Sequence, residues 1–142
     1  METEFNFNSQ ICTTREQSER LLALGLKKET ADMQLARTDA FKDIELIIPY
    51  PPDEKGEDIP AWSLHKLLCI LPKYIQIPDN VWEYKHDLYL SIDEGLYIRY
   101  EEKINGPCFD KTFWKDDIYQ NCISCIEWLI KEGHFNKEYL EE

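Results

Sequence analysis

IPAWSLHKLLCILP, residues 59–72, predicts a short apolar helix with a proline near each end. Pro60 marks its start and Pro72 its stop, because proline cannot lie inside a helix. Ser63 is a suitable N-cap, since its hydroxyl can accept a hydrogen bond from a free amide of the first turn. Trp62 and Leu67 have the spacing of a hydrophobic staple. So short a helix is marginal alone, and we therefore expect tertiary packing to hold it in the core.

A first helix is predicted over residues 14–24, upstream of this central one. Thr13 and Thr14 each begin a capping box, in two frames one residue apart. Gly25 ends the helix in the left-handed position, and Leu26 can fold back on it as in a Schellman ending.

The last helix is predicted over residues 116–132. Asp116 and Asp117 complement the positive end of its dipole. Its apolar residues recur at three- and four-residue steps, which gives the helix one buried stripe. Gly133 closes it as Gly25 closes the first.

Alternating or β-branched runs predict the strands. Residues 32–37 and 44–48 form one hairpin, and residues 74–77 form a short strand. Residues 88–92 and 96–100 form a second hairpin, whose alternation predicts one buried face and one solvated face.

Helices outside runs of adjacent antiparallel strands predict an α+β fold. The order is α-β-β-α-β-β(-β)-α, with three helices packed on an antiparallel sheet of two hairpins. A chain of 142 residues is most simply one domain, residues 1–142. Residues 1–10 and 136–142 are expected to be loosely ordered.

The chain is acidic, with a net charge of −12 that lies almost entirely in residues 43–142. This charge disfavours direct binding of nucleic acid, which needs a basic surface, and suits a basic protein partner or solubility alone. The sequence shows neither a membrane span nor a signal peptide, which predicts a cytoplasmic protein without membrane contact.

Five cysteines without an export signal indicate reduced thiols, most of them buried. Cys122 and Cys125 are the candidates for a metal or thiol-redox site, because two thiolates at this spacing can hold zinc or form a redox pair. The pair falls inside the predicted last helix, and no second motif of this kind exists. Core packing is the preferred interpretation, with Cys122 buried and Cys125 at the border of the apolar stripe.

His65 and Cys69 stand one helical turn apart, a spacing that can supply two metal ligands. No third ligand is evident, and we expect His65 on the polar side of its helix beside Lys66. Nucleophile-elbow, phosphate-loop and dinucleotide-binding motifs are absent from the sequence. We therefore expect no catalytic residue and no cofactor.

Two aromatic residues border the proline-rich loop of residues 49–58. Tyr50 and Trp62 are candidates for anchoring a partner protein, since exposed aromatic residues commonly dominate interfaces. For Trp62 the preferred interpretation is that it only staples its helix.

Several segments resemble a family of small uncharacterised proteins of Bacteroides-type bacteria, often carried in prophage-like or mobile-element regions. The resemblance implies a small intracellular accessory protein and assigns no catalytic role to any residue. It rests on Cys12-Thr13-Thr14-x-Glu16-Gln17-Ser18, Leu22-x-Leu24-Gly25, Ala31-Asp32-Met33, Pro60-Ala61-Trp62-Ser63-Leu64 and Ile126-Glu127-Trp128-Leu129.

The leading hypothesis is a non-enzymatic protein-binding module, its oligomeric state left open. A metal-binding or thiol-redox protein using Cys122 and Cys125 is the alternative. An acidic mimic of nucleic acid, which would block a nucleic-acid-binding protein, is the third.

Overall fold

The structure is a computed structural model and describes residues 9–38, 41–51, 58–78, 83–92, 95–101, 110–115 and 117–142. Its helices are α1 (Arg15–Ala23), α2 (Leu64–Ile70) and α3 (Ile118–Lys131), with 3-10 turns η1 (Lys28–Thr30) and η2 (Lys137–Tyr139). Its strands are β1 (Met33–Thr38), β2 (Phe41–Ile48), β3 (Ile59–Ala61), β4 (Tyr74–Pro78), β5 (Glu83–Ile92), β6 (Leu96–Glu101) and β7 (Asp110–Phe113).

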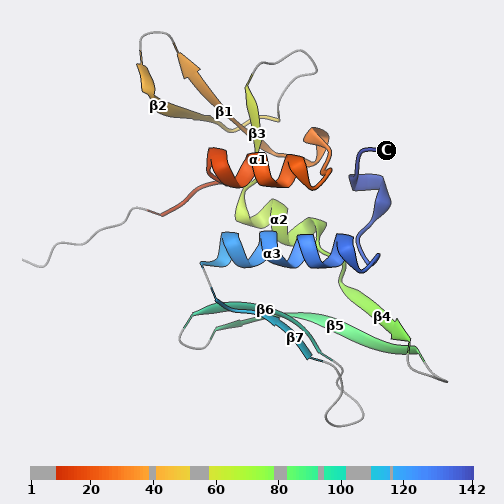
Figure 1. Ribbon diagram of the computed structural model, residues 1–142. Coiled ribbons are helices and arrows are strands. Elements are labelled where there is room, and N and C mark those ends of the chain that lie inside the picture. Colours follow the sequence, from red (N-terminus) through yellow and green to blue (C-terminus); the bar gives the residue numbers. More distant parts are fainter. Residues whose placement is uncertain are drawn as a thin grey trace, which may run out of the picture.

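The described strands form two antiparallel sheets, of order β2-β1-β3 and β4-β5-β6-β7. Figure 1 shows the three helices stacked between them, with α1 nearest the first sheet and α3 over the second. The prediction of a single α+β domain is confirmed. The prediction of one antiparallel sheet of two hairpins is wrong, because the hairpins belong to separate sheets. Alternation in a sequence marks strands and not their partners.

The central helix predicted within residues 59–72 is present as α2, over Leu64–Ile70. The Ser63 hydroxyl accepts from the Lys66 amide at 3.1 Å, and the helix ends before Pro72. Residues 59–61 instead form β3, an edge strand in which Pro60 lies opposite Gln34. Proline is tolerated there because an edge strand need not donate every amide to a neighbour.

Both long helices end as predicted. Thr14 and Gln17 complete the capping box of α1, so the second of the two predicted frames is used. At the other end of α1, Gly25 has φ +96° and the Leu26 amide donates to the Leu21 carbonyl at 3.2 Å. Gly133, with φ +77°, ends α3 in the same left-handed conformation.

The β5–β6 hairpin buries only part of its apolar face. Ile98 and Tyr100 are fully buried, and α3 lies over β6 and β7. Leu90 and Ile92, on the same face of β5, are 50% and 81% exposed. The prediction of one buried face is therefore wrong for this end of β5, because alternation shows which side chains share a face and not how far the covering helix reaches.

Residues 136–142 are docked on the end of α1. The Lys27 amide donates to the Tyr139 carbonyl at 2.8 Å, and the Glu141 amide donates to the Gly25 carbonyl at 2.7 Å. Leu140 forms a β-bridge with Leu26. The expectation of a loose end is thus wrong for these residues, because backbone hydrogen bonds to a distant segment fix them. Residues 1–8 lie outside the described part of the chain.

The main core lies between the helices and the four-stranded sheet. Its completely buried side chains include Leu21, Trp62, Leu67, Ile98, Ile123, Ile126 and Leu129. A second, smaller cluster under the three-stranded sheet contains Cys12, Leu35 and Ala61. Among the described residues, no helix is long and apolar enough to cross a membrane.

Candidate functional site

Trp62 is not a surface residue. Its side chain is 0% exposed, and its indole Nε1–H donates to Thr30 Oγ1 at 2.9 Å. The prediction that Trp62 anchors a partner is therefore wrong: a tryptophan whose ring is packed and whose N–H is paired belongs to the core. Tyr50, the other predicted anchor, is 68% exposed and stays a candidate. Residues 52–57 of the loop between them lie outside the described residues.

Three of the segments that carry the sequence resemblance meet around Trp62. The Thr13 amide donates to the Trp62 carbonyl at 2.9 Å, and the Trp62 amide donates to Thr13 Oγ1 at 3.0 Å. The Ser63 amide donates to Asp32 Oδ1 at 2.8 Å, and the Ser63 hydroxyl donates to Asp32 Oδ2. These polar groups satisfy one another, so the cluster joins three segments of the chain and presents no free group for chemistry.

Cys122 and Cys125 are both 0% exposed on α3. Cys125 is thus fully buried, and the prediction that it lies at the border of the stripe is wrong. Burial raises the pKa of Cys122 to about 12 and raises that of Cys125 well above its ordinary value. A thiol that does not ionise near neutral pH is a poor nucleophile and a poor ligand, and both side chains act as packing groups. Cys108 lies outside the described residues.

No group of three or more His, Cys, Asp or Glu side chains converges within the part of the chain that the structure describes. His65 and Cys69 contact each other on α2, with His65 Nε2 at 3.4 Å from Cys69 Sγ. Both residues are exposed, which confirms the prediction for His65.

An apolar groove of about 490 Å³ lies beside the three-stranded sheet. Residues 9–16 form one wall, and Leu35, Glu45 and Ile47 form the other. The segment of the first wall is fixed where Cys12 forms a β-bridge with Ser63. The groove is therefore built by docking the segment before α1 next to a sheet.

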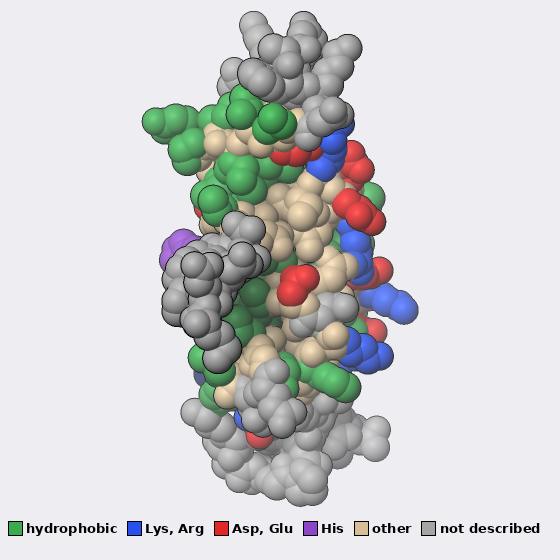
Figure 2. Space-filling model, turned by 90° about the vertical axis from the view of Figure 1, so that its left-hand side faces the viewer, with side chains coloured by type: hydrophobic (Ala, Val, Ile, Leu, Met, Phe, Trp, Pro, Cys, Tyr) green, Lys and Arg blue, Asp and Glu red, His purple; other side chains and the backbone are tan. Residues whose placement is uncertain are grey.

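Strand β2 borders this groove and is the outer strand of its sheet. Ile44 and Leu46 are 52% and 43% exposed on one face, and Ile47 is 42% exposed on the groove face. Among the described residues, no strand pairs with the outer edge of β2. Figure 2 faces the side of the molecule that carries β2 and shows hydrophobic side chains gathered in its upper part. Exposed apolar side chains on an unpaired edge mark a surface that can accept another strand.

An ion pair fixes the rim of the groove. Arg15 donates to both carboxylate oxygens of Glu45, and Arg37 lies 3.0 Å from one of them. The hydrogen bond from Arg15 lowers the pKa of Glu45, with a smaller contribution from Arg37. At the floor of the groove, burial raises the pKa of the Cys12 thiol, and Asp32 and Glu45 add to this effect.

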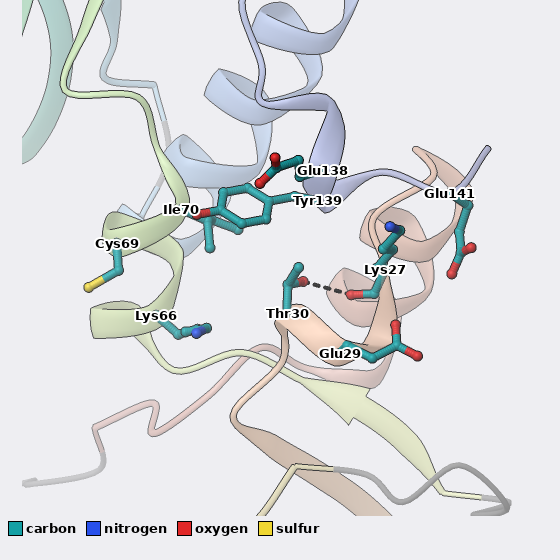
Figure 3. Close-up of a pocket in the computed structure, with 9 residues that line it drawn as sticks. All are labelled: Lys27, Glu29, Thr30, Lys66, Cys69, Ile70, Glu138, Tyr139 and Glu141. Carbon is teal, nitrogen blue, oxygen red and sulfur yellow. Dashed lines mark hydrogen bonds between the residues drawn. The ribbon is translucent and has the colours of Figure 1, made fainter.

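A second pocket, of about 570 Å³, lies between η1, α2 and η2. Figure 3 shows Lys27, Lys66, Glu29, Glu138 and Glu141 around it, so both signs of charge line its walls. Cys69 lies at its edge with the side chain pointing away from the other lining residues (Figure 3). This mixture of charges does not specify one ligand.

No family model, no curated protein and no solved structure matches this chain. Support for a function therefore comes from the geometry of the structure. Sequence reasoning recognised residues 44–48 as a strand but not as an exposed surface. These residues are apolar except for Glu45, and this composition was the available signal, but it is typical of a strand buried on both faces.

Proposed function

We propose that this protein is a cytoplasmic, non-enzymatic module that binds an extended segment of another protein along β2. The observation that carries the proposal is the exposed apolar surface of β2, at an unpaired edge and next to an apolar groove. Adding a strand to such an edge supplies main-chain hydrogen bonds for affinity and side-chain pockets for specificity.

The groove supplies the specificity. A partner strand beside β2 directs alternate side chains to the two faces of the sheet. Those on the face of Ile47 would contact the groove between Leu35 and residues 9–16. Those on the opposite face would contact Ile44 and Leu46. The preferred partner segment therefore carries apolar side chains at alternate positions.

The net charge of −12 favours a partner with basic residues near this apolar segment and disfavours a nucleic acid. The resemblance to small proteins of mobile elements is compatible with such an accessory role. Long-range attraction of this kind raises association rates more than it raises affinity, and it weakens with salt.

The proposal is tested with a displayed library of random extended peptides selected on the intact chain. Selected peptides are then titrated into isotope-labelled protein, and amide shifts are mapped by NMR. We expect alternating apolar sequences and shifts confined to β2, Tyr50 and residues 9–16. Ile47→Lys is expected to weaken binding by about tenfold or more, the effect of losing a buried interface residue.

Leu90→Lys is the matched control, because Leu90 is an aliphatic residue on the other sheet with a similar exposure, 50% against 42% for Ile47. It should bind the selected peptides like the parent chain. Peptides that bind Ile47→Lys and the parent equally, or shifts centred away from β2, would refute the proposal.

A further inference from the structure

His65 and Cys69 form a pair of exposed donor atoms on α2. They stand four residues apart, so one helical turn brings their side chains to the same face. Nε2 of His65 and Sγ of Cys69 are 3.4 Å apart. Neither residue takes part in the β2 surface or in the core, and the structure gives the pair no packing role.

The separation of these two atoms matches the geometry of a tetrahedral zinc site. Zinc binds thiolate sulfur at about 2.3 Å and imidazole nitrogen at about 2.0–2.1 Å, which at a tetrahedral angle places the two donors about 3.5 Å apart. The distance between the two atoms, which contact each other in the structure, is therefore close to the one that a shared zinc ion requires. The exposed position of Cys69 allows its thiol proton to leave for solvent when the metal binds.

One chain supplies only half of the ligands. A structural zinc site takes four nitrogen or sulfur ligands, and no third His, Cys, Asp or Glu joins this pair within the described residues. Two copies related by a two-fold axis through the metal would bring together two cysteines and two histidines. We propose that His65 and Cys69 bind a thiophilic divalent cation such as zinc, and that this ion joins two copies of the chain. This inference concerns a different surface from β2 and does not depend on the proposed function.

The test uses the full chain without a histidine tag, kept reduced, and titrated with zinc sulfate. Calorimetry measures stoichiometry, and size exclusion with light scattering measures mass. We expect one zinc ion for two chains and a zinc-dependent dimer that a chelator returns to monomers. Cobalt in place of zinc should give the strong visible absorption of a tetrahedral thiolate site.

Cys69→Ser and His65→Gln should each abolish the zinc-dependent dimer and lower zinc affinity by about tenfold or more, since even outer-shell changes cost about 10–100-fold. His134→Gln removes another histidine outside the pair and should leave both properties unchanged. Thermal unfolding without metal shows that the variants are folded. A 1:1 complex without dimerisation, or zinc binding that survives Cys69→Ser, overturns the inference.

Discussion

The two sheets of this protein are packed to different degrees. The four-stranded sheet buries Ile75, Ile98 and Tyr100 against the helices. The three-stranded sheet has a small buried cluster on one face and leaves its outer strand β2 exposed. The helices and the larger sheet therefore hold most of the buried core, whereas β2 contributes little to it. Under the proposed function, β2 is the binding surface. Substitutions in the two regions should therefore affect different properties.

The largest loss of stability is expected from Trp62→Ala. The indole is fully buried and donates to Thr30 Oγ1, so its removal leaves a large cavity and takes away one of the hydrogen bonds of that hydroxyl. Such substitutions cost about 3–5 kcal/mol, a large share of the stability of a domain. Urea denaturation followed by circular dichroism measures the change. Trp114→Ala, at a residue 58% exposed, is the control and should cost about 0.5 kcal/mol or less. Equal losses at both positions would contradict the core assignment.

Asp32→Ala should follow, with a loss of about 1.5–3 kcal/mol for a charged acceptor of two hydrogen bonds. Its carboxylate holds the backbone and side chain of Ser63, the N-cap of α2. Chemical denaturation measures the effect. Ser63→Ala alone should cost about 1 kcal/mol, the typical value for a cap. Strict additivity in the double variant would show that the two residues are not coupled.

Arg15→Gln should have a smaller, pH-dependent effect. Arg15 lowers the pKa of Glu45, so their pairing stabilises the fold fully above the ordinary pKa of 4.5 and is lost as pH falls through the lower value of the folded state. The pair is partly exposed and should contribute only about 0.2–1 kcal/mol at neutral pH. The carboxyl carbon shift of Glu45 against pH reports the pKa, which Arg15→Gln should raise. Arg37→Gln should raise it less, and a reversed order would contradict the geometry.

Leu46→Lys should have the smallest effect on stability, within about 0.5 kcal/mol, because the side chain is exposed on the edge strand. A lysine on an edge strand also opposes pairing with other chains. Denaturation curves and light scattering measure the two properties together. A loss of several kcal/mol would mean that β2 is part of the core, and would contradict the conclusion that the two sheets are packed to different degrees.

Local signals in the sequence predicted most of the elements. Ser63, Gly25 and Gly133 mark helix ends because capping needs a particular hydroxyl or a left-handed backbone, and such needs are visible within a few residues. Strand β3 was not predicted, since Pro60 argues against a strand unless the strand is known to lie at an edge. The hydrogen bonds between Asp32 and Ser63 could not be predicted from local sequence either, because 31 residues separate the two positions.

The candidate site was harder to predict than the fold. Trp62 and Tyr50 border the same loop, yet one is buried and the other exposed, and only tertiary packing decides between them. Likewise, Ile44 and Leu46 look like core residues until the edge position of β2 is known. The spacing of His65 and Cys69 was visible, but their exposure and the distance between their donor atoms were not.

The position of α3 has a consequence for how the protein is made. This helix follows the strands β1 to β7 in the described part of the chain, yet it lies in the middle of the stack, between α2 and the four-stranded sheet (Figure 1). A nascent chain that has not yet emerged beyond residue 117 exposes Leu67, Ile98 and Tyr100 to solvent. The main core therefore closes only late in translation, and until then the chain is a substrate for chaperones and proteases.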